Sequence, residues 1–429
     1  MFPPPPVRIL DSRKPVSFWC VIPHRWHVNS NDRAIVGLVM ISHAMVHTYE
    51  LSIPIFMTVW LDLFEISPGR LGLVVSAGYA LFGLGALPGG VLADVLGSRR
   101  LIAVALFGMG GSFVALSLSP SIPVIAVSLL LWGSAASVYH PSGLSLISTG
   151  VDARGDAFAF HGMAGNAGIA FGPLATTLLL LFTDWHLVAL VLAVPALLAG
   201  AYALRLRIDE SAAVSDDADD KTGGVSSLAE FVAESKLLFF GPFVAVFGIV
   251  MASGLYYRGV LTFLPEMIAE FPMFEPIQIA NRALEPSRYF YSGLLMVGIA
   301  GQYVGGKLTK RMPTERAIAI AFGVLALLAL AFLPASNAGL IPFLVLGALL
   351  GFFLFVVQPL YQATVAEYSP AGTRGLSYGY TYLGTFGIGA SGAAIAGGVL
   401  EFFSPGVLFF VLAGIALVAA ILGAVLSFR

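Results

Sequence analysis

The most constraining feature of this chain is the length of its stretches without a charged residue. A helix that rises about 1.5 Å per residue crosses the hydrocarbon core of a bilayer in about 20 residues. Only 11% of the residues are charged and 58% are hydrophobic, whereas a soluble domain has roughly 25% charged residues. The sequence therefore predicts an all-α membrane protein. The uncharged stretches are residues 71–93, 101–151, 157–183, 185–204, 237–257, 317–366, 375–400 and 402–428.

Two of these stretches are long enough for a helical hairpin each, and proline-containing breakers at 119–123 and 334–337 lie near their middles. With both stretches divided, the sequence predicts twelve transmembrane helices. Their expected positions are near 33–60, 70–95, 99–118, 122–149, 154–183, 186–207, 237–264, 288–309, 316–334, 338–366, 373–400 and 404–427.

The distribution of basic residues predicts the orientation. With an even number of spans and the N-terminus inside, all but four of the 22 Lys and Arg residues are cytoplasmic, which fits the positive-inside bias. We therefore expect an integral protein of the cell membrane with both termini in the cytoplasm. Residues 1–32 form a cytoplasmic tail in this interpretation.

The chain divides into two related halves. Residues 33–207 form an N-terminal six-helix bundle, 208–236 a polar and acidic cytoplasmic linker expected to be a flexible tether, and 237–429 a C-terminal six-helix bundle. Gly90 corresponds to Gly306 and Pro141 to Pro359 at nearly the same separation. Such order favours a duplicated unit, as in transporters built from parallel repeats.

A glycine-rich and basic motif follows the second predicted helix. It reads G-x-L-x-D-x-x-G-x-R-R and consists of Gly90, Leu92, Asp94, Gly97, Arg99 and Arg100. In a twelve-helix context this motif resembles the signature of the major facilitator superfamily. The resemblance implies two pseudo-symmetric six-helix bundles. It also implies a gating role for the motif, as a latch that stabilises one closed state of the transporter.

A narrower resemblance is to the fosmidomycin-resistance branch, whose members are proton-coupled efflux carriers. It depends on His43, Tyr49 and Pro54, on Tyr139-His140-Pro141, on His161-Gly162 with Gly165-Asn166 and Gly172-Pro173, and on Thr262–Pro265. The branch usually has Asp where this chain has His47, and often Gln where it has Glu50.

Three ionisable residues share one face of the first predicted helix. At about 100° per residue, His43, His47 and Glu50 lie at about 0°, 40° and −20°. Ionisable groups in hydrocarbon cost about 2.5–3.5 kcal/mol on insertion scales, which favours a functional role. We expect Glu50 to carry a coupled proton, with His43 and His47 along its path; polar contact between helices is the alternative.

Further polar residues are expected around a central cavity. Arg258, near the outer end of the seventh helix, either pairs with Glu50, binds an anionic substrate group, or snorkels to the headgroups. The remaining candidates for cavity lining are Tyr256, Tyr257, Tyr139, His140, His161, Asn166, Gln358, Tyr361 and Gln362.

These features predict a secondary active transporter, an antiporter that exports a small organic compound in exchange for protons. No P-loop motif is present, so an ion or substrate gradient must supply the energy, and we expect no cofactor and no enzyme activity. The expected partners are a small-molecule substrate, protons and the lipid bilayer, without nucleic acid, and we expect a monomer. Two alternatives stay open: a divalent transition-metal transporter with His43, His47 and Glu50 as ligands, and a non-transporting membrane receptor or scaffold.

Overall fold

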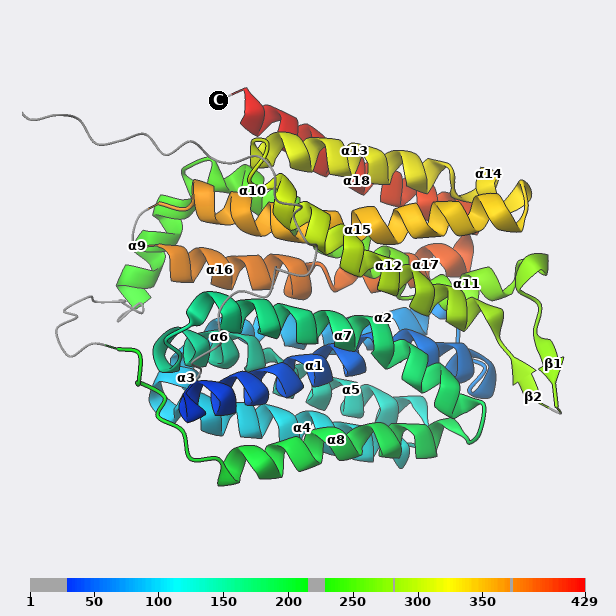
Figure 1. Cartoon of the computed structure of the whole chain (residues 1–429). Coiled ribbons are helices and arrows are strands. Elements are labelled where there is room, and N and C mark those ends of the chain that lie inside the picture. Colours follow the sequence, from blue (N-terminus) through cyan, green and yellow to red (C-terminus); the bar gives the residue numbers. More distant parts are fainter. Residues whose placement is uncertain (1–28, 215–227, 281, 371–372, 429) are drawn as a thin grey trace, which may run out of the picture.

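The computed structural model describes residues 29–214, 228–280, 282–370 and 373–428. It is a bundle of long helices that run side by side, with the first half of the chain on one side and the second half on the other (Figure 1). The first half contains α1 (Ser30–Leu63), α2 (Pro68–Leu84), α3 (Ala86–Leu96), α4 (Ser98–Ser117), α5 (Ile122–Ser137), α6 (Tyr139–Gly150), α7 (Arg154–Leu180) and α8 (Trp185–Arg205).

The second half is built from α10 (Phe243–Leu261), α11 (Leu264–Ala269), α12 (Pro286–Leu308), α13 (Thr314–Leu330), α14 (Phe332–Asn337), α15 (Leu340–Tyr368), α16 (Arg374–Tyr382), the π-helical segment η2 (Leu383–Ile388), α17 (Ser391–Phe402) and α18 (Pro405–Ser427). A 3-10 turn η1 (Pro272–Phe274) and a hairpin of β1 (Ile277–Ile279) and β2 (Arg282–Leu284) follow α11. The antiparallel register pairs Gln278 with Ala283. We call the end of the bundle with this hairpin the hairpin end, and the opposite end, where the two halves are joined, the linker end (Figure 1).

Among the described residues, ten helical segments are long and apolar enough to cross a membrane. The segments at the other two predicted spans are α12 and α13. The first carries the polar residues Arg288, Gln302 and Lys307, and the second has only 17 residues. The helical membrane fold is thus confirmed, while the count of twelve spans stays a prediction.

Helix breaks occur where the sequence contains proline or closely packed glycine. Val138 separates α5 from α6, three residues before Pro141. Proline has no N–H to donate and its ring collides with the carbonyl of the preceding turn, so the helix bends there. The break places Tyr139 and His140, both buried, at the start of α6.

Glycines bring α1 and α7 into backbone contact. A Cβ on Gly172 would lie 2.6 Å from the Cα of Thr48, and one on Gly168 would collide with the carbonyl of Ala44. Only glycine permits this separation, as at many helix contacts in membranes. The close approach sets His161 of α7 against His43 of α1.

At the hairpin end, α2 and α17 join the two halves. Ser76 donates a hydrogen bond to the carbonyl of Ala390 at 2.8 Å, and Ser67 donates one to Glu401 Oε2 at 2.9 Å. A Cβ on Gly72 would lie 2.8 Å from the carbonyl oxygen of Ala393. The two halves are therefore closed against each other at this end.

The predicted linker is more ordered than expected in its described parts. Asn31 binds the backbone of Asp209 in both directions, accepting at 2.8 Å and donating at 3.0 Å. Residues 228–236, at the end of the expected tether, belong to the helix α9 (Leu228–Phe239), because apolar residues recur there at helical spacing. The acidic run 216–220 and most of the tail 1–32 lie outside the described residues.

Candidate functional site

The ionisable face of α1 forms a hydrogen-bonded chain inside the bundle. His47 Nδ1 lies 2.5 Å from Glu50 Oε2, and His47 Nε2 lies 3.0 Å from His43 Nε2. His43 Nδ1 lies 2.7 Å from the backbone carbonyl of His161. Both histidines are 8% exposed and Glu50 is 1% exposed. The helical spacing read from the sequence therefore corresponds to one continuous polar path.

An ion pair between the two halves ends this path. Arg258 Nη2 of α10 donates to Glu50 Oε1 of α1. The guanidinium carbon also lies 3.6 Å from the centre of the Tyr79 ring, and Tyr79 donates to the carbonyl of Glu50 at 3.0 Å. Arg258 is only 2% exposed. Its geometry is that of a paired cation inside the protein, and the alternative of snorkelling to the headgroups does not fit this burial.

Two further histidines extend the chain. The imidazole of His161 stacks on that of His43, with ring centres 3.8 Å apart and planes inclined by 12°. His140 Nε2 lies 3.2 Å from His43 Nε2. His140 Nδ1 and His161 Nε2 are buried and have no hydrogen-bond partner among the described residues. Four imidazoles from α1, α6 and α7 thus meet in one cluster.

A cavity of about 610 Å³ adjoins this cluster, a size within the range of small-molecule sites. It reaches from Glu50 to Ser148 and Phe158, near the linker ends of α6 and α7. Of the predicted residues, the following line it: His43, His47, Glu50, His140, His161, Asn166, Tyr257, Gln358, Tyr361 and Gln362.

Three predicted residues do not line the cavity. Tyr139 is fully buried and donates to the carbonyl of Val39 at 2.5 Å, and Tyr256 donates to that of Leu325 at 3.0 Å. These two tyrosines connect helices and are not among the residues that line the cavity. Arg258 does not line the cavity itself, but it is bonded to Glu50, which does line it.

The sequence analysis missed a substantial part of the wall. It is contributed by α10, α12, α15, α16 and η2, and its members are Ser253, Gln302, Leu354, Tyr378, Thr381, Tyr382, Thr385 and Phe386. The alternation of Tyr, Thr and Gly along 378–387 breaks an otherwise aliphatic pattern, and that polarity was the available signal. The π-helical turn in this segment is of a kind often found at functional sites.

The histidines also have the geometry of a possible metal site. One ring nitrogen from each of His43, His47 and His140 lies within 4.8 Å of the others. The predicted ligand set was His43, His47 and Glu50. The geometry does not favour that set, because one oxygen of Glu50 is engaged by Arg258 and the other by His47.

The glycine and arginine motif lies at the linker end. Gly97 has φ +83° between α3 and α4, a conformation that favours glycine. Arg99 Nη1 donates to the carbonyls of Ala203 and Leu204 at 3.1 Å each, and so caps the end of α8. Arg100 is exposed, and a Cβ on Gly90 would meet open space. The side chain of Asp94 is not among those described, so its latch role stays a prediction.

Two curated relatives cover part of the chain. The puromycin resistance protein of Streptomyces alboniger is 29% identical over 242 residues, which are 54% of this chain and 46% of the relative. An uncharacterized MFS-type transporter of Bacillus subtilis, YqjV, is 25% identical over 226 residues, which are 52% of this chain and 53% of the relative. The chain therefore spans about half the length of the curated relatives that it matches.

Solved structures share the fold over nearly the whole chain. A bacterial homologue of the human lysosomal transporter Spinster has a TM-score of 0.71 at 13% identity, with 93% of this chain and 97% of the other covered. The nucleoside transporter NupG has a TM-score of 0.72 at 14% identity, with 91% and 99% covered. A D-xylose–proton symporter has a TM-score of 0.69 at 15% identity, with 92% and 97% covered. At such identities the likeness concerns the fold alone.

The model of the Major Facilitator Superfamily matches residues 32–392. The family favours neither the metal-transporter alternative nor a non-transporting receptor, and the narrower resemblance to the fosmidomycin-resistance branch stays a prediction. This match extends over most of the chain, which therefore belongs to the major facilitator superfamily and is an integral membrane transporter rather than an enzyme.

Proposed function

We propose that this transporter couples proton movement to the export of a small organic compound, with Glu50 as the proton carrier. The two halves rock against each other, so that the cavity opens alternately to the two sides of the membrane, as in other carriers built from repeats. The observation that supports this role is the hydrogen-bonded chain from Glu50 through His47 to His43, because it connects the carboxylate to imidazoles that can hold and pass on a proton.

The proton count follows from the hydrogen-bond partners. A backbone carbonyl only accepts, so His43 Nδ1 carries a proton toward His161. If His43 Nε2 pairs with His47 rather than with His140, which lies 3.2 Å away, a second proton lies between the Nε2 atoms of His43 and His47, and a third between His47 Nδ1 and Glu50 Oε2. Two neutral imidazoles carry only two protons. In this arrangement the third proton is the exchangeable one, and it is shared between His47 and Glu50.

Arg258 links this proton to the conformational cycle. Glu50 belongs to the first half and Arg258 to the second. Their ion pair therefore joins the halves at the deep end of the cavity, away from the linker end. A proton that settles on Glu50 removes the charge on which the pair depends, and losing it restores the attraction. A group whose two states favour different openings couples the proton to the transport step.

The composition of the cavity favours an uncharged or weakly charged substrate. Most residues of its second-half wall carry an amide or a hydroxyl group, among them Gln302, Gln358, Gln362 and four tyrosines. Glu50, the one carboxylate in the wall, is already paired. Amides and phenols orient an organic ligand by hydrogen bonds and ring contacts without requiring a charge.

Export is proposed as the direction because one relative bears the name of a puromycin resistance protein. With it we propose location in the cell membrane, cytoplasmic termini and a monomeric state. In this orientation the linker end faces the cytoplasm, and the cavity reaches toward the side from which an exported compound would enter.

The test uses purified protein in proteoliposomes with an imposed pH gradient, and a panel of aromatic organic compounds that starts with puromycin. We expect gradient-driven accumulation by the original protein. Glu50→Gln should still bind the transported compound and exchange it at equilibrium, but should neither accumulate it nor move protons with it. If the Gln variant accumulates the compound with an unchanged pH dependence, Glu50 is not the proton carrier.

A further inference from the structure

Helix α9 lies across the linker end of the bundle and crosses the direction of the long helices (Figure 1). One face of α9 is attached to α16 through Tyr380. The ring centres of Phe231 and Phe239 lie 6.4 and 4.9 Å from that of Tyr380, and the hydroxyls of Ser235 and Tyr380 are 2.8 Å apart. The position of α9 on the bundle is therefore fixed by specific contacts.

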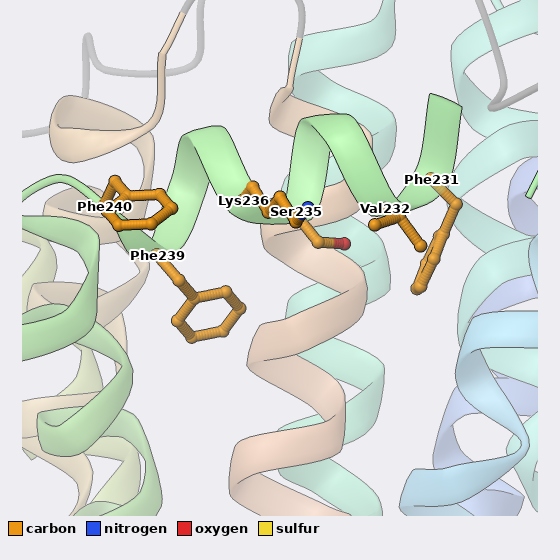
Figure 2. Close-up of a pocket in the computed structure, with 6 residues that line it drawn as sticks. All are labelled: Phe231, Val232, Ser235, Lys236, Phe239 and Phe240. Carbon is orange, nitrogen blue, oxygen red and sulfur yellow. The ribbon is translucent and has the colours of Figure 1, made fainter. Parts of the chain in front are cut away.

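Beside this attachment, and sharing Phe231, Ser235 and Phe239 with it, α9 has an apolar and open surface. A groove of about 310 Å³ runs along it, lined by Phe231, Val232, Ser235, Lys236, Phe239 and Phe240 (Figure 2). Val232 is 42% exposed and Phe240 is 90% exposed. Exposed aromatic and aliphatic surface of this kind is unfavourable in water and favours an apolar occupant.

This groove continues the lipid-facing surface of a spanning helix. Phe240 lies three residues before the start of α10, and Val244 on that helix is 50% exposed. Lys236 is the one charged residue of the groove, and among the described residues no salt bridge includes it. A lysine with an apolar stem at the end of a span is suited to the phosphate level of a leaflet.

We propose that α9 lies in the lipid–water interface and that its groove binds an acyl chain of an anionic phospholipid, with the ammonium group of Lys236 on the phosphate. The bound lipid fills the angle between α9 and the long helices. Because α9 holds Tyr380, and because Tyr378 and Tyr382 of the same helix line the cavity, the lipid also supports one wall of the transport path.

Spin labels on the full-length protein test this placement. Cys20 is the single cysteine, so Cys20→Ser provides the background for Val232→Cys in the groove and Glu234→Cys as the matched control. These positions are two residues apart and point about 200° apart around the helix. In phosphatidylcholine nanodiscs we expect the label at Val232 to collide more with oxygen than with a water-soluble nickel chelate, and the label at Glu234 to show the reverse. Water-like accessibility at both positions would overturn the interfacial placement.

The lipid headgroup is tested on the same Val232 label. Adding phosphatidylglycerol to the nanodiscs should reduce the mobility of this label, and Lys236→Ser should abolish that reduction. Lys236→Arg should retain it, because the charge is kept. If phosphatidylglycerol leaves the mobility unchanged, or if Lys236→Ser responds like the original protein, the anionic lipid site is wrong.

Discussion

The ion pair between Glu50 and Arg258 allows a quantitative prediction about stability. Glu50→Gln removes the only carboxylate that forms a salt bridge with Arg258 among the described residues, and leaves a guanidinium that is 2% exposed. Its Nε atom already has no hydrogen-bond partner there. Breaking a buried pair by removing one partner costs about 3–5 kcal/mol, because the other charge stays buried and uncompensated. The Gln amide oxygen can still accept one hydrogen bond, so we expect a loss of about 3 kcal/mol.

A double-mutant cycle distinguishes the stranded charge from a general packing defect. Arg258→Met in the Glu50→Gln background removes the stranded cation and fills a similar volume, so the double variant should be more stable than Glu50→Gln alone. Glu275→Gln is the control, because Glu275 is exposed at the hairpin end and such substitutions usually change stability by less than about 0.5 kcal/mol.

The assay is unfolding of the detergent-solubilised protein in a dodecyl sulfate titration, with thermal midpoints as a second measurement. A double variant that lost as much stability as the two single substitutions together would refute the stranded-charge argument. So would a Glu50→Gln variant that is as stable as the original protein. Either result would mean that water already solvates Arg258, and the ion pair could not then join the two halves.

Three further predictions concern other parts of the chain. Gly165→Ala should lower transport at matched expression, because the added Cβ would lie 2.6 Å from His43 Nδ1. Gly155→Ala, at the start of α7, should be neutral, because a Cβ there has nothing within 4 Å; equal activities of the two variants would refute the contact with His43. Arg99→Ala should lower the thermal midpoint through loss of charged hydrogen bonds to the end of α8, each worth about 1.5–3 kcal/mol before solvent screening at this partly exposed site, while Arg100→Ala should not. A protease site inserted at 216–224 should be cleaved only from the cytoplasm, and cleavage from outside intact cells would reverse the proposed orientation.

The membrane fold could be predicted from sequence because its cause is local. A bilayer leaves no water for backbone groups, so an uncharged stretch of about 20 residues must become a helix whatever surrounds it. The alignment of His43, His47 and Glu50 is equally local, since it follows from 3.6 residues per turn. The helices and the shared face could therefore both be predicted without knowing which helices pack against them.

The partners of these residues are decided only by the tertiary structure. Nothing within α1 indicates that Arg258, 208 positions later, approaches Glu50, or that Tyr139 and Tyr256 bond to backbone carbonyls and not to a ligand. The cavity wall on α16 and η2 and the attachment of α9 to Tyr380 likewise depend on contacts between helices. The sequence by itself determined which segments enter the membrane and which of their faces are polar, because those properties repeat within each helix. Which polar faces meet was decided by close packing at Gly165, Gly168 and Gly172, since their missing side chains set the distance between α1 and α7.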